Sequence, residues 1–600
     1  MLDNVVAPLI EPTIDGNLAE TVVRNATDTP HSIAFSKRTG SGWADVTAAE
    51  FRSDVDALAK GFIAAGLEPG ERVALMSRTR YEWTLVDYAA WTAGAVTVPI
   101  YETSSADQIA WILKDSGARA IVVETLTHAV AVGQIHDQVA GLKDVWQIDA
   151  GALTELVESG VDITDEELDA RRAGANRRSI ATIIYTSGTT GRPKGCELTH
   201  GNFKDLAENA YRKLTSILDA EGASTVLFLP LAHVFARFVQ VLCVESNARM
   251  AHSADIKTLL DDLGSFRPTF ILAVPRVFEK IYNSAEQQAA SDGKGKIFGA
   301  AATVAIDWSW ALDTGSVPLP LRLKHAVFDR LVYTKIRAAL GGNVQYAVSG
   351  GAPLGTRLGH FFRGIGITVL EGYGLTETTA PATFNTPLKV KIGTVGPPLP
   401  GVGIRIDEDG EILVKGVNLF AGYHNNAEAT AEAIRDGWFH TGDLGELDED
   451  GFLLITGRKK EILVTAGGKN VAPAALEDLL RAHPLVAECM VVGDQKPFIA
   501  ALVTLDAEML PTWAKNNGLT GLTLDQARTH PAVIAEIDKA VAHANTTVST
   551  AESIRKYVIL PGGFTEENGY LTPSLKLKRS IVMRDFGDEI EDLYSSPRAD

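Results

Sequence analysis

Cysteine is scarce in this sequence of 600 residues, and long apolar runs and an excess of basic residues are missing from it. Its three cysteines, Cys196, Cys243 and Cys489, contain no CxxC spacing, so neither a disulfide framework nor a cysteine zinc site is expected. Lys and Arg number 56 and Asp and Glu number 75, which gives a formal net charge of −19. That balance argues against a nucleic-acid binder and against a polybasic membrane-surface protein, although a local basic pocket stays compatible with it.

Apolar runs are all shorter than the roughly 18 residues that a transmembrane helix needs. The opening residues, MLDNVVAPLIEPTIDG, include acidic side chains and have no basic start and no long apolar segment, so a cleaved signal peptide is not expected. We therefore expect a cytoplasmic protein. The sequence leaves open peripheral contact with the inner face of a membrane, and it does not indicate an oligomeric state.

Helical and strand patterns alternate over the first third of the chain. Thr47 and Glu50 have the spacing of a capping box ahead of apolar residues at helical intervals, and Gly66 stands where that helix would end. Short apolar runs such as 72–76 and 120–123 indicate buried strands. Strands that alternate with helices predict a covered, largely parallel sheet, so the large N-terminal part is expected to have an α/β fold.

Glycine and proline become dense between about 390 and 457, where two DEDG turns each precede a short apolar or alternating run. This texture predicts small antiparallel strands that form a barrel-like β part. The basic cluster GRKKE follows, and Pro473 then stands at a suitable first position of a helix. We expect an N-terminal domain over 1–457, a hinge at 458–460 and a smaller, mobile α+β C-terminal domain over 461–600.

The densest local signal is the segment YTSGTTGRPKG, a loop of Gly, Ser and Thr that follows a strand-like run and contains the cation Lys194. Such a loop exposes backbone N–H groups and hydroxyls that can wrap phosphate oxygens. It is not a Walker A loop, because Pro193 and Gly195 stand where that motif requires Gly and Ser or Thr. The next residues, CELTHGN, indicate a returning strand with Thr199 as a helix cap, so no helix dipole would hold the phosphate.

Four further blocks follow this loop in order: PLAHVFAR at 230–237, SGGAPL at 349–354, EGYGLTET at 371–378, and GWFHTGDLGELDEDGFLLITGRKKEILVTAGGKN at 437–470. A weaker fifth block is TPSLKLKRS at 572–580. Together they resemble the adenylate-forming synthetases, the acyl-CoA synthetase superfamily, over roughly residues 30 to 580. The 437–470 block is similar to the signature of the long-chain fatty acyl-CoA synthetases.

The resemblance implies a reaction in two halves. A carboxylate attacks the α-phosphate of ATP and gives acyl-AMP and pyrophosphate, and the thiol of CoA then attacks the acyl carbon and releases AMP. The substrates implied are a long-chain fatty acid, ATP and CoA, with Mg²⁺ to neutralise phosphate charge. The implied activity is ATP-dependent long-chain fatty acid–CoA ligation.

By the same resemblance, one group of residues holds the nucleotide. The residues that match the positions binding the β- and γ-phosphates are Thr186, Ser187, Gly188, Thr189, Thr190, Gly191 and Lys194. Those that match the wall around the adenine and the α-phosphate are Gly351, Glu371, Gly372, Tyr373 and Thr376. Asp443 matches the acceptor of the ribose hydroxyls, and Arg458 matches a second nucleotide contact. Glu377 and the Thr186 hydroxyl match the magnesium site, a donor set that suits a hard cation keeping several waters.

Other residues match the reacting groups and the moving parts of the family. Lys576 matches the lysine that reaches the carboxylate and the α-phosphate, although Leu575 replaces the usual glycine before it. His233 matches a histidine near the acyl carboxylate. Lys460 matches the hinge about which the C-terminal domain rotates. Three further residues match the surroundings of the CoA channel: Gly467, Gly468 and Lys469.

Arg237 and Gly374 bear on the acyl chain. Some relatives place an aromatic gate to the fatty-acid tunnel at the position of Arg237, so an ionic or hydrogen-bonded gate is expected there. Acetate-specific relatives fill the position of Gly374 with tryptophan, so glycine predicts a tunnel that continues past it. The competing interpretation is that Gly374 serves only the backbone conformation.

Two other functions stay open at this point. A fatty acyl-AMP ligase would hand its product to a carrier protein, and a silent nucleotide-binding module would keep the pocket without the chemistry. Four retained residues argue against the silent module: Lys194, Glu377, Asp443 and Lys576. An amino-acid-activating domain is disfavoured, because no Asp lies within 233–237 to meet an α-ammonium group.

Overall fold

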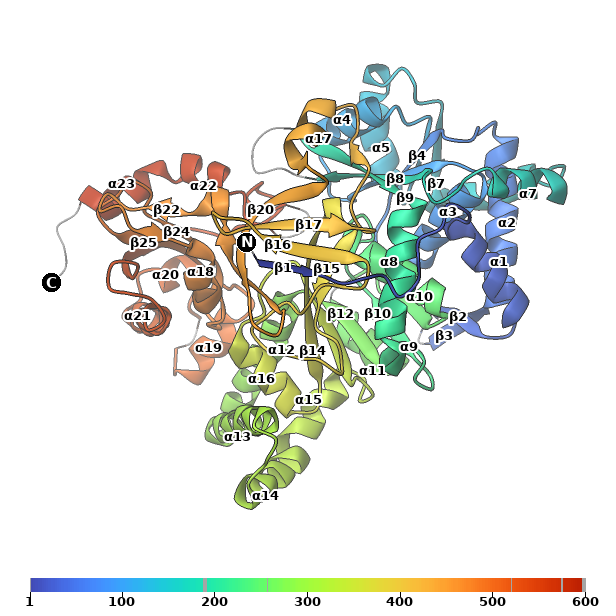
Figure 1. The fold of residues 1–600 in the computed structure, drawn as a ribbon. Coiled ribbons are helices and arrows are strands. Elements are labelled where there is room, and N and C mark those ends of the chain that lie inside the picture. Colours follow the sequence, from blue (N-terminus) through green and yellow to red (C-terminus); the bar gives the residue numbers. More distant parts are fainter. Residues whose placement is uncertain are drawn as a thin grey trace.

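The structure is a computed structural model that describes residues 2–40, 42–186, 192–255, 257–519, 521–572 and 576–595. A large N-terminal part and a smaller C-terminal part lie side by side, and the C-terminal part is drawn in orange and red in Figure 1. Among the residues that the structure describes, no helix is long and apolar enough to cross a membrane.

The first sheet of the large part has the strand order β18-β9-β8-β5-β4-β6-β7. Its strands are β4 (Arg72–Met76), β5 (Val96–Ile100), β6 (Ala120–Val123), β7 (Asp144–Gln147), β8 (Ile180–Thr186), β9 (Lys194–Thr199) and β18 (Gly422–Tyr423). The five strands β4 to β8 pair in parallel, while β9 returns antiparallel to β8. The prediction of a largely parallel sheet is confirmed, and so is the returning strand that excludes a Walker A geometry.

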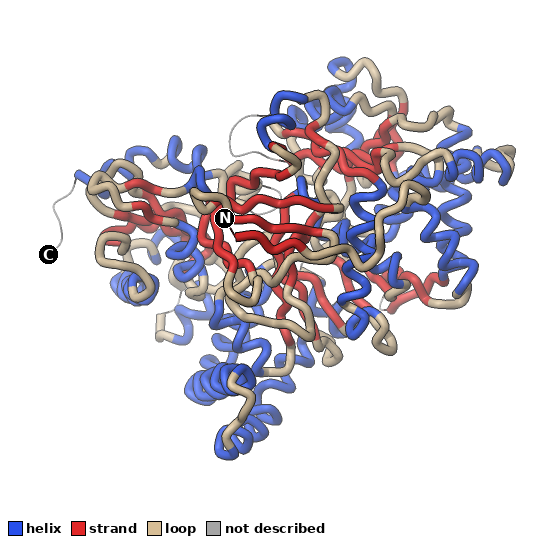
Figure 2. Tube along the Cα trace, viewed as in Figure 1, coloured by secondary structure: helices blue, strands red, loops and turns tan. Residues whose placement is uncertain are grey.

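Helices cover this sheet on both faces (Figure 2). The helices of this region are α1 (Leu18–Asp28), α2 (Ala48–Ala64), α3 (Tyr81–Thr92), α4 (Ala106–Ser116), α5 (Leu126–Ile135), α6 (Ala152–Ser159), α7 (Asp165–Ala173), α8 (His200–Lys213) and α9 (Thr215–Leu218). The predicted capping box begins α2: the Thr47 hydroxyl accepts from the Glu50 N–H at 3.2 Å, and the Glu50 carboxylate accepts from the Thr47 N–H at 2.8 Å. Gly66 follows the helix with a φ of 77°, and Thr199 caps α8 as expected.

Two four-stranded sheets, β10-β11-β2-β3 and β12-β13-β14-β15, complete the α/β region. Their strands are β2 (Ile33–Thr39), β3 (Gly42–Thr47), β10 (Ser224–Leu227), β11 (Arg249–His252), β12 (Phe270–Ala273), β13 (Tyr346–Ser349), β14 (Thr368–Leu375) and β15 (Ala380–Phe384). The parallel strands β12, β13 and β14 end at one edge, so the loops that follow them meet there.

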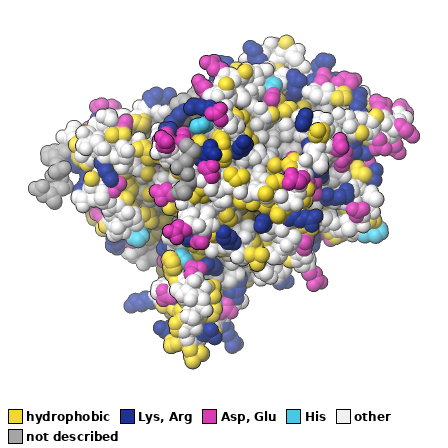
Figure 3. Space-filling view, viewed as in Figure 1, with side chains coloured by type: hydrophobic (Ala, Val, Ile, Leu, Met, Phe, Trp, Pro, Cys, Tyr) yellow, Lys and Arg dark blue, Asp and Glu magenta, His cyan; other side chains and the backbone are white. Residues whose placement is uncertain are grey.

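The helices of this second region are α10 (Val234–Ser246), α11 (Leu259–Phe266), α12 (Pro275–Ser291), α13 (Gly295–Asp313), α14 (Leu319–Phe328), α15 (Thr334–Ala339) and α16 (Thr356–Gly364). Helices α13 and α14 project from the body of the molecule at the bottom of Figure 1, and one face of this projection is visible in Figure 3. A π-helical turn, η3 (Asp329–Tyr333), leads from α14 into α15.

An antiparallel sheet occupies the region where a barrel was expected. Its strands are β1 (Leu2–Val5), β16 (Val402–Ile406), β17 (Glu411–Gly416), β19 (Ile434–Arg435), β20 (Trp438–Leu447) and β21 (Leu453–Arg458), accompanied by α17 (Ala427–Ala433). The order β1-β16-β17-β20-β19, with β21 also paired to β20, does not close on itself. The predicted antiparallel, barrel-like β part is confirmed as an open sheet, in which β1 forms one edge and has no second partner among the described strands.

The C-terminal part is α+β, as predicted. Its strands are β22 (Leu463–Val464), β23 (Asn470–Val471), β24 (Val486–Val492), β25 (Ile499–Leu505) and β26 (Ile554–Ile559). Its helices are α18 (Pro473–Arg481), α19 (Leu510–Asn516), α20 (Leu524–Ala527), α21 (Pro531–Asn545), α22 (Arg579–Asp585) and α23 (Gly587–Ser595). Pro473 is the first residue of α18, where its missing N–H costs no helical hydrogen bond. A 3₁₀ turn, η5 (Lys459–Glu461), joins β21 to this part.

Ion pairs hold the C-terminal part against α12. Arg276 Nη2 lies 2.8 Å from Asp506 Oδ2, and Lys280 Nζ lies 2.8 Å from Glu508 Oε2. Ser291 also donates its hydroxyl to Asn516 Oδ1 at 2.7 Å. These contacts fix an orientation in which residues near the end of the chain reach the large part.

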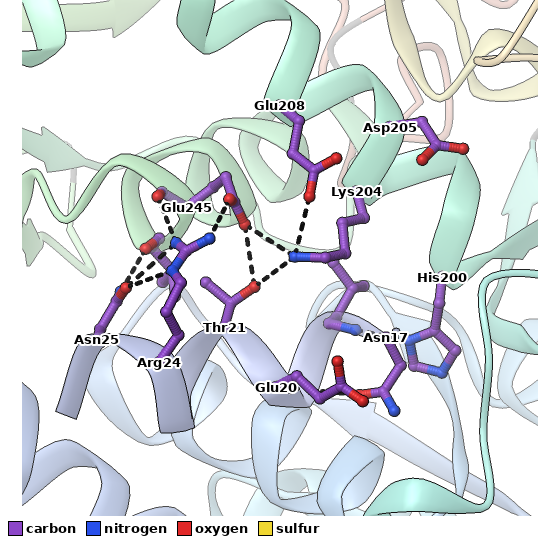
Figure 4. Close-up of polar contacts among 12 residues, drawn as sticks. Asn17, Glu20, Thr21, Arg24, Asn25, His200, Lys204, Asp205, Glu208 and Glu245 are labelled. Carbon is purple, nitrogen blue, oxygen red and sulfur yellow. Dashed lines mark hydrogen bonds and ion pairs between the residues drawn. The ribbon is translucent and has the colours of Figure 1, made fainter. Parts of the chain in front are cut away.

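A buried polar cluster joins α1, α8 and α10 (Figure 4). Its centre is Lys204 Nζ, which lies 3.0 Å from Thr21 Oγ1 and 3.3 Å from a carboxylate oxygen of Glu208 and of Glu245. Arg24 Nη1 lies 2.6 Å from the other Glu245 oxygen. We call these five side chains the Lys204 cluster. Each of its charges has an opposite charge within hydrogen-bonding reach.

Candidate active site

Strands β20 and β21 place Asp443 opposite Arg458 across their antiparallel pairing. Arg458 donates its Nε–H to Asp443 Oδ1 at 2.7 Å. Tyr373, on β14, donates its hydroxyl to Asp443 Oδ2 at 2.7 Å. Burial and the neighbouring Asp443 raise the pKa of Tyr373 well above its usual value, so the phenol keeps its proton and the bond. The carboxylate is held between two donors and retains lone pairs for further hydroxyl groups.

Lys576 reaches this place from the C-terminal part. Desolvation by the surrounding protein, and then the positive charge of Arg458, lower the pKa of Lys576. The carboxylates of Asp443 and Glu377 oppose that shift only in part. Among the described residues its ammonium forms no ion pair, and its side chain remains open to solvent. Lys576 is therefore a cation in a cleft, and an anion bound there would stabilise its charged form.

His233 lies close enough to Lys576 to feel its charge. It is the N-cap of α10, and its Nδ1 accepts the Phe235 N–H at 3.2 Å. Burial first, and then Lys576, lower the pKa of His233 to about 4. The ring is neutral at pH 7, and because Nδ1 accepts, Nε2 carries the proton. His233 is thus a neutral hydrogen-bond donor, not a base.

The two ends of the glycine-rich loop lie side by side. Thr186 ends β8 and pairs with Lys194 at the start of β9, and the Thr186 hydroxyl donates to the Lys194 carbonyl at 3.4 Å. The predicted phosphate-binding residues Ser187, Gly188, Thr189, Thr190 and Gly191 lie outside the described residues. The ammonium of Lys194 stands 4.9 Å from the ring centre of Tyr423 and forms no ion pair in the described part of the chain.

Tyr423 connects this loop to the predicted metal ligand. Its hydroxyl donates to Glu377 Oε1 at 2.9 Å, and burial and Glu377 together raise the pKa of Tyr423. Strand β18, which carries Tyr423, pairs with β9 beside the loop. The sequence analysis did not identify Tyr423, because an isolated tyrosine in a two-residue strand gives no local signal. The only local feature of Tyr423 in the sequence is the glycine that precedes it, in AGYH.

The predicted adenine wall contains one buried carboxylate and several close approaches. Glu371 accepts the Leu354 N–H at 3.1 Å, and burial raises its pKa to about 7. A Cβ at Gly372 would meet the Phe384 ring at 2.6 Å, so only glycine leaves the wall flat there. Gly351 has a φ of 87°, which favours glycine. Thr376 begins a 3₁₀ turn, η4 (Thr376–Thr378), that carries Glu377.

Gly374 has a backbone role that the tunnel interpretation does not include. A Cβ at this position would lie 1.7 Å from the carbonyl oxygen of Ala380. The register of β14 and β15 shifts at Tyr373 and Gly374, which brings the two backbones together. A tryptophan could not enter without displacing β15, so the structure favours the competing backbone interpretation at this position.

Arg237 lies in the core, not at a passage. Its side chain is 0% exposed, and it pairs with Asp87, which is equally buried. The guanidinium also donates to Thr182 Oγ1 at 2.6 Å and lies between Trp83 and Trp91. The prediction of a gate at Arg237 is therefore wrong. Its guanidinium is neutralised by Asp87 and its donors are engaged in the core, so the two residues form a structural ion pair.

The predicted hinge residue lies in the turn that follows Arg458 in the chain, and the predicted CoA residues lie in a separate turn. Lys460 is in η5, while its neighbour Lys459 pairs with Glu411 at 3.3 Å. Gly467, Gly468 and Lys469 form the turn between β22 and β23, and Lys469 Nζ lies 3.4 Å from Glu552. In the orientation described, Lys576 of the C-terminal part enters the site, whereas the turn of residues 467–469 does not.

Three cations, Lys194, Arg458 and Lys576, and two carboxylates, Glu377 and Asp443, therefore meet between the two parts. Lys194 and Lys576 have no carboxylate partner among the described residues. This arrangement can bind a polyanion and stabilise negative charge that develops near Lys576.

Comparison with known proteins shows which family uses this arrangement. Residues 22–424 match the family described as AMP-binding enzyme, and residues 460–598 match the AMP-binding enzyme C-terminal domain. The chain belongs to the AMP-binding enzyme family.

Relatives of this AMP-binding enzyme cover nearly its whole length. It is 52% identical over 583 residues to the long-chain-fatty-acid–CoA ligase FadD15 of Mycobacterium bovis. The aligned region covers 96% of this chain and 97% of that protein. It is 31% identical over 634 residues to the long-chain-fatty-acid–CoA ligase ACSBG2 of Xenopus laevis, which spans 99% of this chain and 85% of that protein.

Solved structures show the same fold. The A domain of carboxylic acid reductase from Segniliparus rugosus, in complex with AMP and a co-purified carboxylic acid, has a TM-score of 0.74 at 21% identity, over 97% of this chain and 94% of that chain. The o-succinylbenzoate coenzyme A synthetase of Bacillus subtilis, in complex with ATP and magnesium, has a TM-score of 0.66 at 21% identity, over 93% and 98%. The predicted fold of the AMP-binding enzyme is confirmed.

Proposed function

We propose that this AMP-binding enzyme activates a long-chain fatty acid with ATP and transfers the acyl group to CoA. Relatives named long-chain-fatty-acid–CoA ligase match it over at least 96% of its length, at 52% identity for the mycobacterial one. The observation that carries the proposal is Lys576, an unpaired ammonium beside Arg458 and Asp443. Adenylation builds negative charge between a carboxylate and an α-phosphate, and a cation held there stabilises it.

In the first half-reaction, the fatty acid carboxylate forms a bond to the α-phosphorus, and the bond to the leaving pyrophosphate breaks. Lys576 would neutralise the charge that develops at the reacting oxygens. The neutral imidazole of His233 would donate its Nε2–H to the carboxylate and orient it. Asp443, fixed by Tyr373 and Arg458, would accept the ribose hydroxyls.

Glu377 and the Thr186 hydroxyl fit a Mg²⁺ ion that is bound mainly through phosphate oxygens. One Glu377 oxygen accepts from Tyr423, and the other accepts no hydrogen bond from a described residue. A single carboxylate suits a cation that keeps its waters and takes its other ligands from the substrate. When bound, the ion would neutralise phosphate charge. Lys194 would add a second cation next to it.

In the second half-reaction, the C-terminal part would turn about Lys460 and bring residues 467–469 to the CoA channel. Lys460 forms no ion pair in the described part, so the turn would break none of its own contacts. The contacts of Arg276 and Lys280 with the C-terminal part would break. These pairs are partly exposed and contribute little, so they would not prevent rotation.

A fatty acyl-AMP ligase is the remaining alternative. It would share every feature of the adenylation site and differ in the acceptor of the acyl group. The identity to relatives named as CoA ligases favours CoA. A silent nucleotide-binding module is disfavoured, because Lys576 lies near Arg458 and Asp443 and has no ion-pair partner among the described residues.

One experiment tests all three functions. Purified protein is given ATP, Mg²⁺ and palmitate, and pyrophosphate release is measured with and without CoA, while mass spectrometry follows acyl-AMP and palmitoyl-CoA. The proposal expects pyrophosphate, and palmitoyl-CoA once CoA is present. Acyl-AMP that CoA does not consume would favour the carrier-dependent ligase, and no pyrophosphate with any fatty acid would leave only the silent module.

Acyl-chain length and location are part of the same proposal. We infer a preference for long chains from the named relatives, and a series from acetate to palmitate under the same assay tests it. ATP and CoA are both cytoplasmic metabolites, which supports a cytoplasmic enzyme. Activity restricted to acetate would contradict the chain-length inference while leaving the ligase chemistry intact.

A further inference from the structure

The projecting helices form a helical arm, which we define as α13, α14 and η3 (Figure 1). No side chain of α14 is buried, although the helix is mostly apolar. The helix is attached from one side only: the His325 ring stacks on Trp308 with centroids 4.0 Å apart, and it contacts the Gly364 carbonyl at 2.7 Å. The opposite side of α14 faces away from the protein.

That outward side carries three large apolar residues at intervals of four, and a fourth follows at the same interval in η3. Leu319, Leu323, Val327 and Leu331 are 68%, 63%, 56% and 52% exposed. Four residues are slightly more than one α-helical turn, so these side chains follow one another along the helix. We call them the α14 stripe. Single exposed leucines are ordinary, but a continuous row on a projecting helix marks an interaction surface.

Basic residues flank the stripe. Arg322 and Lys324 precede and follow Leu323, which places them about 100° to either side of it around the helix. Arg330 stands beside Leu331 in the same way. None of these three cations forms an ion pair among the described residues. Figure 3 shows yellow side chains along the arm with dark blue ones next to them.

The charge of this segment is opposite to that of the chain. Between residues 314 and 335 there are four Lys and Arg (Arg322, Lys324, Arg330 and Lys335) and one Asp, which gives +3, whereas the whole protein carries −19. A helix with an apolar row between cations matches a surface that is apolar inside and negatively charged outside. A second copy of this acidic protein matches it less well, because the cations of two facing stripes would repel each other.

We propose that the α14 stripe docks on an anionic phospholipid bilayer, with its four apolar side chains among the acyl chains and the flanking cations at the phosphates. Docking adds apolar burial to electrostatic attraction, so both parts contribute to binding. The proposal does not depend on the ligase activity, since it concerns a surface away from Lys576. It also differs from a spanning segment, because α14 lies along the surface.

The test uses full-length protein and flotation with vesicles. One set of vesicles is phosphatidylcholine, and the other is an equimolar mixture of phosphatidylcholine and phosphatidylglycerol. The variant with Leu319, Leu323, Val327 and Leu331 changed to Ser should lose binding by about 10²-fold or more. Arg322→Ser with Lys324→Ser should lose about fivefold per charge on the anionic vesicles and little on the neutral ones. High salt should mimic the second variant.

A matched control changes apolar residues that are exposed elsewhere: Leu126→Ser, Val161→Ser and Leu388→Ser, which are 67%, 77% and 92% exposed. This control should float like the unchanged protein. A further variant, Leu323→Cys, is labelled at its thiol with an environment-sensitive fluorophore, since Cys196, Cys243 and Cys489 are buried, and it should show blue-shifted emission with anionic vesicles and quenching by brominated lipids. These two readouts separate bilayer insertion from a loss of fold.

Three outcomes would overturn the proposal. In the first, the unchanged protein does not float with anionic vesicles. In the second, the variant with all four stripe residues changed to Ser floats as well as the control, which would assign binding to another surface. Alternatively, the protein forms dimers that the fourfold variant dissociates, without vesicle binding, which would make a second copy the occupant. Activity on palmitate in detergent should be equal for all variants, so failure here leaves the proposed ligase function untouched.

Discussion

The Lys204 cluster and the candidate active site are both rich in lysines, arginines and carboxylates, and they differ in how the charges are paired. In the Lys204 cluster, the ammonium has two carboxylates and a hydroxyl within 3.3 Å (Figure 4). In the active site, Lys576 has no ion-pair partner among the described residues, and its pKa is lowered by desolvation and by Arg458. The first arrangement is complete without a ligand, and the second is completed by an anion.

The difference separates structural from functional charge without reference to any relative. A buried charge whose partners are all protein groups stabilises one packing of helices, and removing it leaves an uncompensated partner. A cation whose pKa is lowered by desolvation and by a neighbouring cation is less stable in its charged form, and such a group is typical of a site that acts on a substrate. Changes in each cluster should therefore have opposite signatures in stability and in activity.

The largest expected effect comes from the fully buried pair of Arg237 and Asp87, which belongs to the paired class. Arg237→Met leaves Asp87 without its cation in the core, and this should lower the free energy of unfolding by about 3–5 kcal/mol. Urea unfolding followed by tryptophan fluorescence measures it. Adding Asp87→Leu should recover most of the loss. If the double variant is no more stable than the single one, the loss does not come from leaving Asp87 without its cation.

Lys576→Ala should lower the rate of acyl-AMP formation by about 10²–10³, because it removes a cation from charge that develops in the transition state. Thioester formation from supplied acyl-AMP and the urea midpoint should change little. Pyrophosphate release measures the first half-reaction, and Lys578→Ala is the control. Equal losses in both half-reactions would make Lys576 structural and erase the contrast with Lys204.

Lys204→Met should lower the free energy of unfolding by about 1 kcal/mol, since it removes the hydrogen bonds of the ammonium while Glu208 keeps Arg177 and Glu245 keeps Arg24. The KM for ATP and the adenylation rate should be unchanged at temperatures where the variant is folded. Lys213→Met, on the exposed end of the same helix, is the control for the loss of one lysine. A changed KM with normal stability would move the Lys204 cluster into the functional class.

The smallest effect is a shift in pH dependence. The lowered pKa of Lys576 means that its ammonium loses the proton at a lower pH than an ordinary lysine, so adenylation should decline on the alkaline side before pH 10.5. His233, with a pKa of about 4, should leave no step between pH 5 and pH 8. Rate profiles for pyrophosphate release check both. Lys576→Arg should remove the alkaline decline, and a decline that persists would belong to another group.

Local features of the fold could be predicted because the signals lie close together in the sequence. The capping box of Thr47 and Glu50, the cap at Thr199 and the helix start at Pro473 each depend on a few neighbouring residues. The pairing of Asp443 with Arg458 follows from strands joined by one short turn. The family resemblance identified Asp443, Arg458 and the other candidate site residues from ordered motifs.

The remaining features depend on contacts that no local pattern encodes. Tyr423 reaches Glu377 because β18 pairs with β9, which is more than two hundred residues earlier. The close approach at Gly374 comes from the backbone of Ala380 across a bulge. Arg237 was expected at a gate because the family resemblance places a gate to the fatty-acid tunnel at its position, and only packing shows that it pairs with Asp87 in the core.

Strand β1 has a consequence for the order in which the chain can fold. Leu2–Val5 pairs with Val402–Ile406, and Arg405 adds an ion pair to Asp3 at 2.7 Å. Strand β1 therefore leaves the ribosome about 400 residues ahead of its partner β16, which is roughly 20–80 s of synthesis at ordinary elongation rates. During that interval an unpaired strand edge is exposed. The antiparallel sheet is thus among the last pieces of the large part to be completed, and its loss should be an early event when the protein is nicked between β1 and β16.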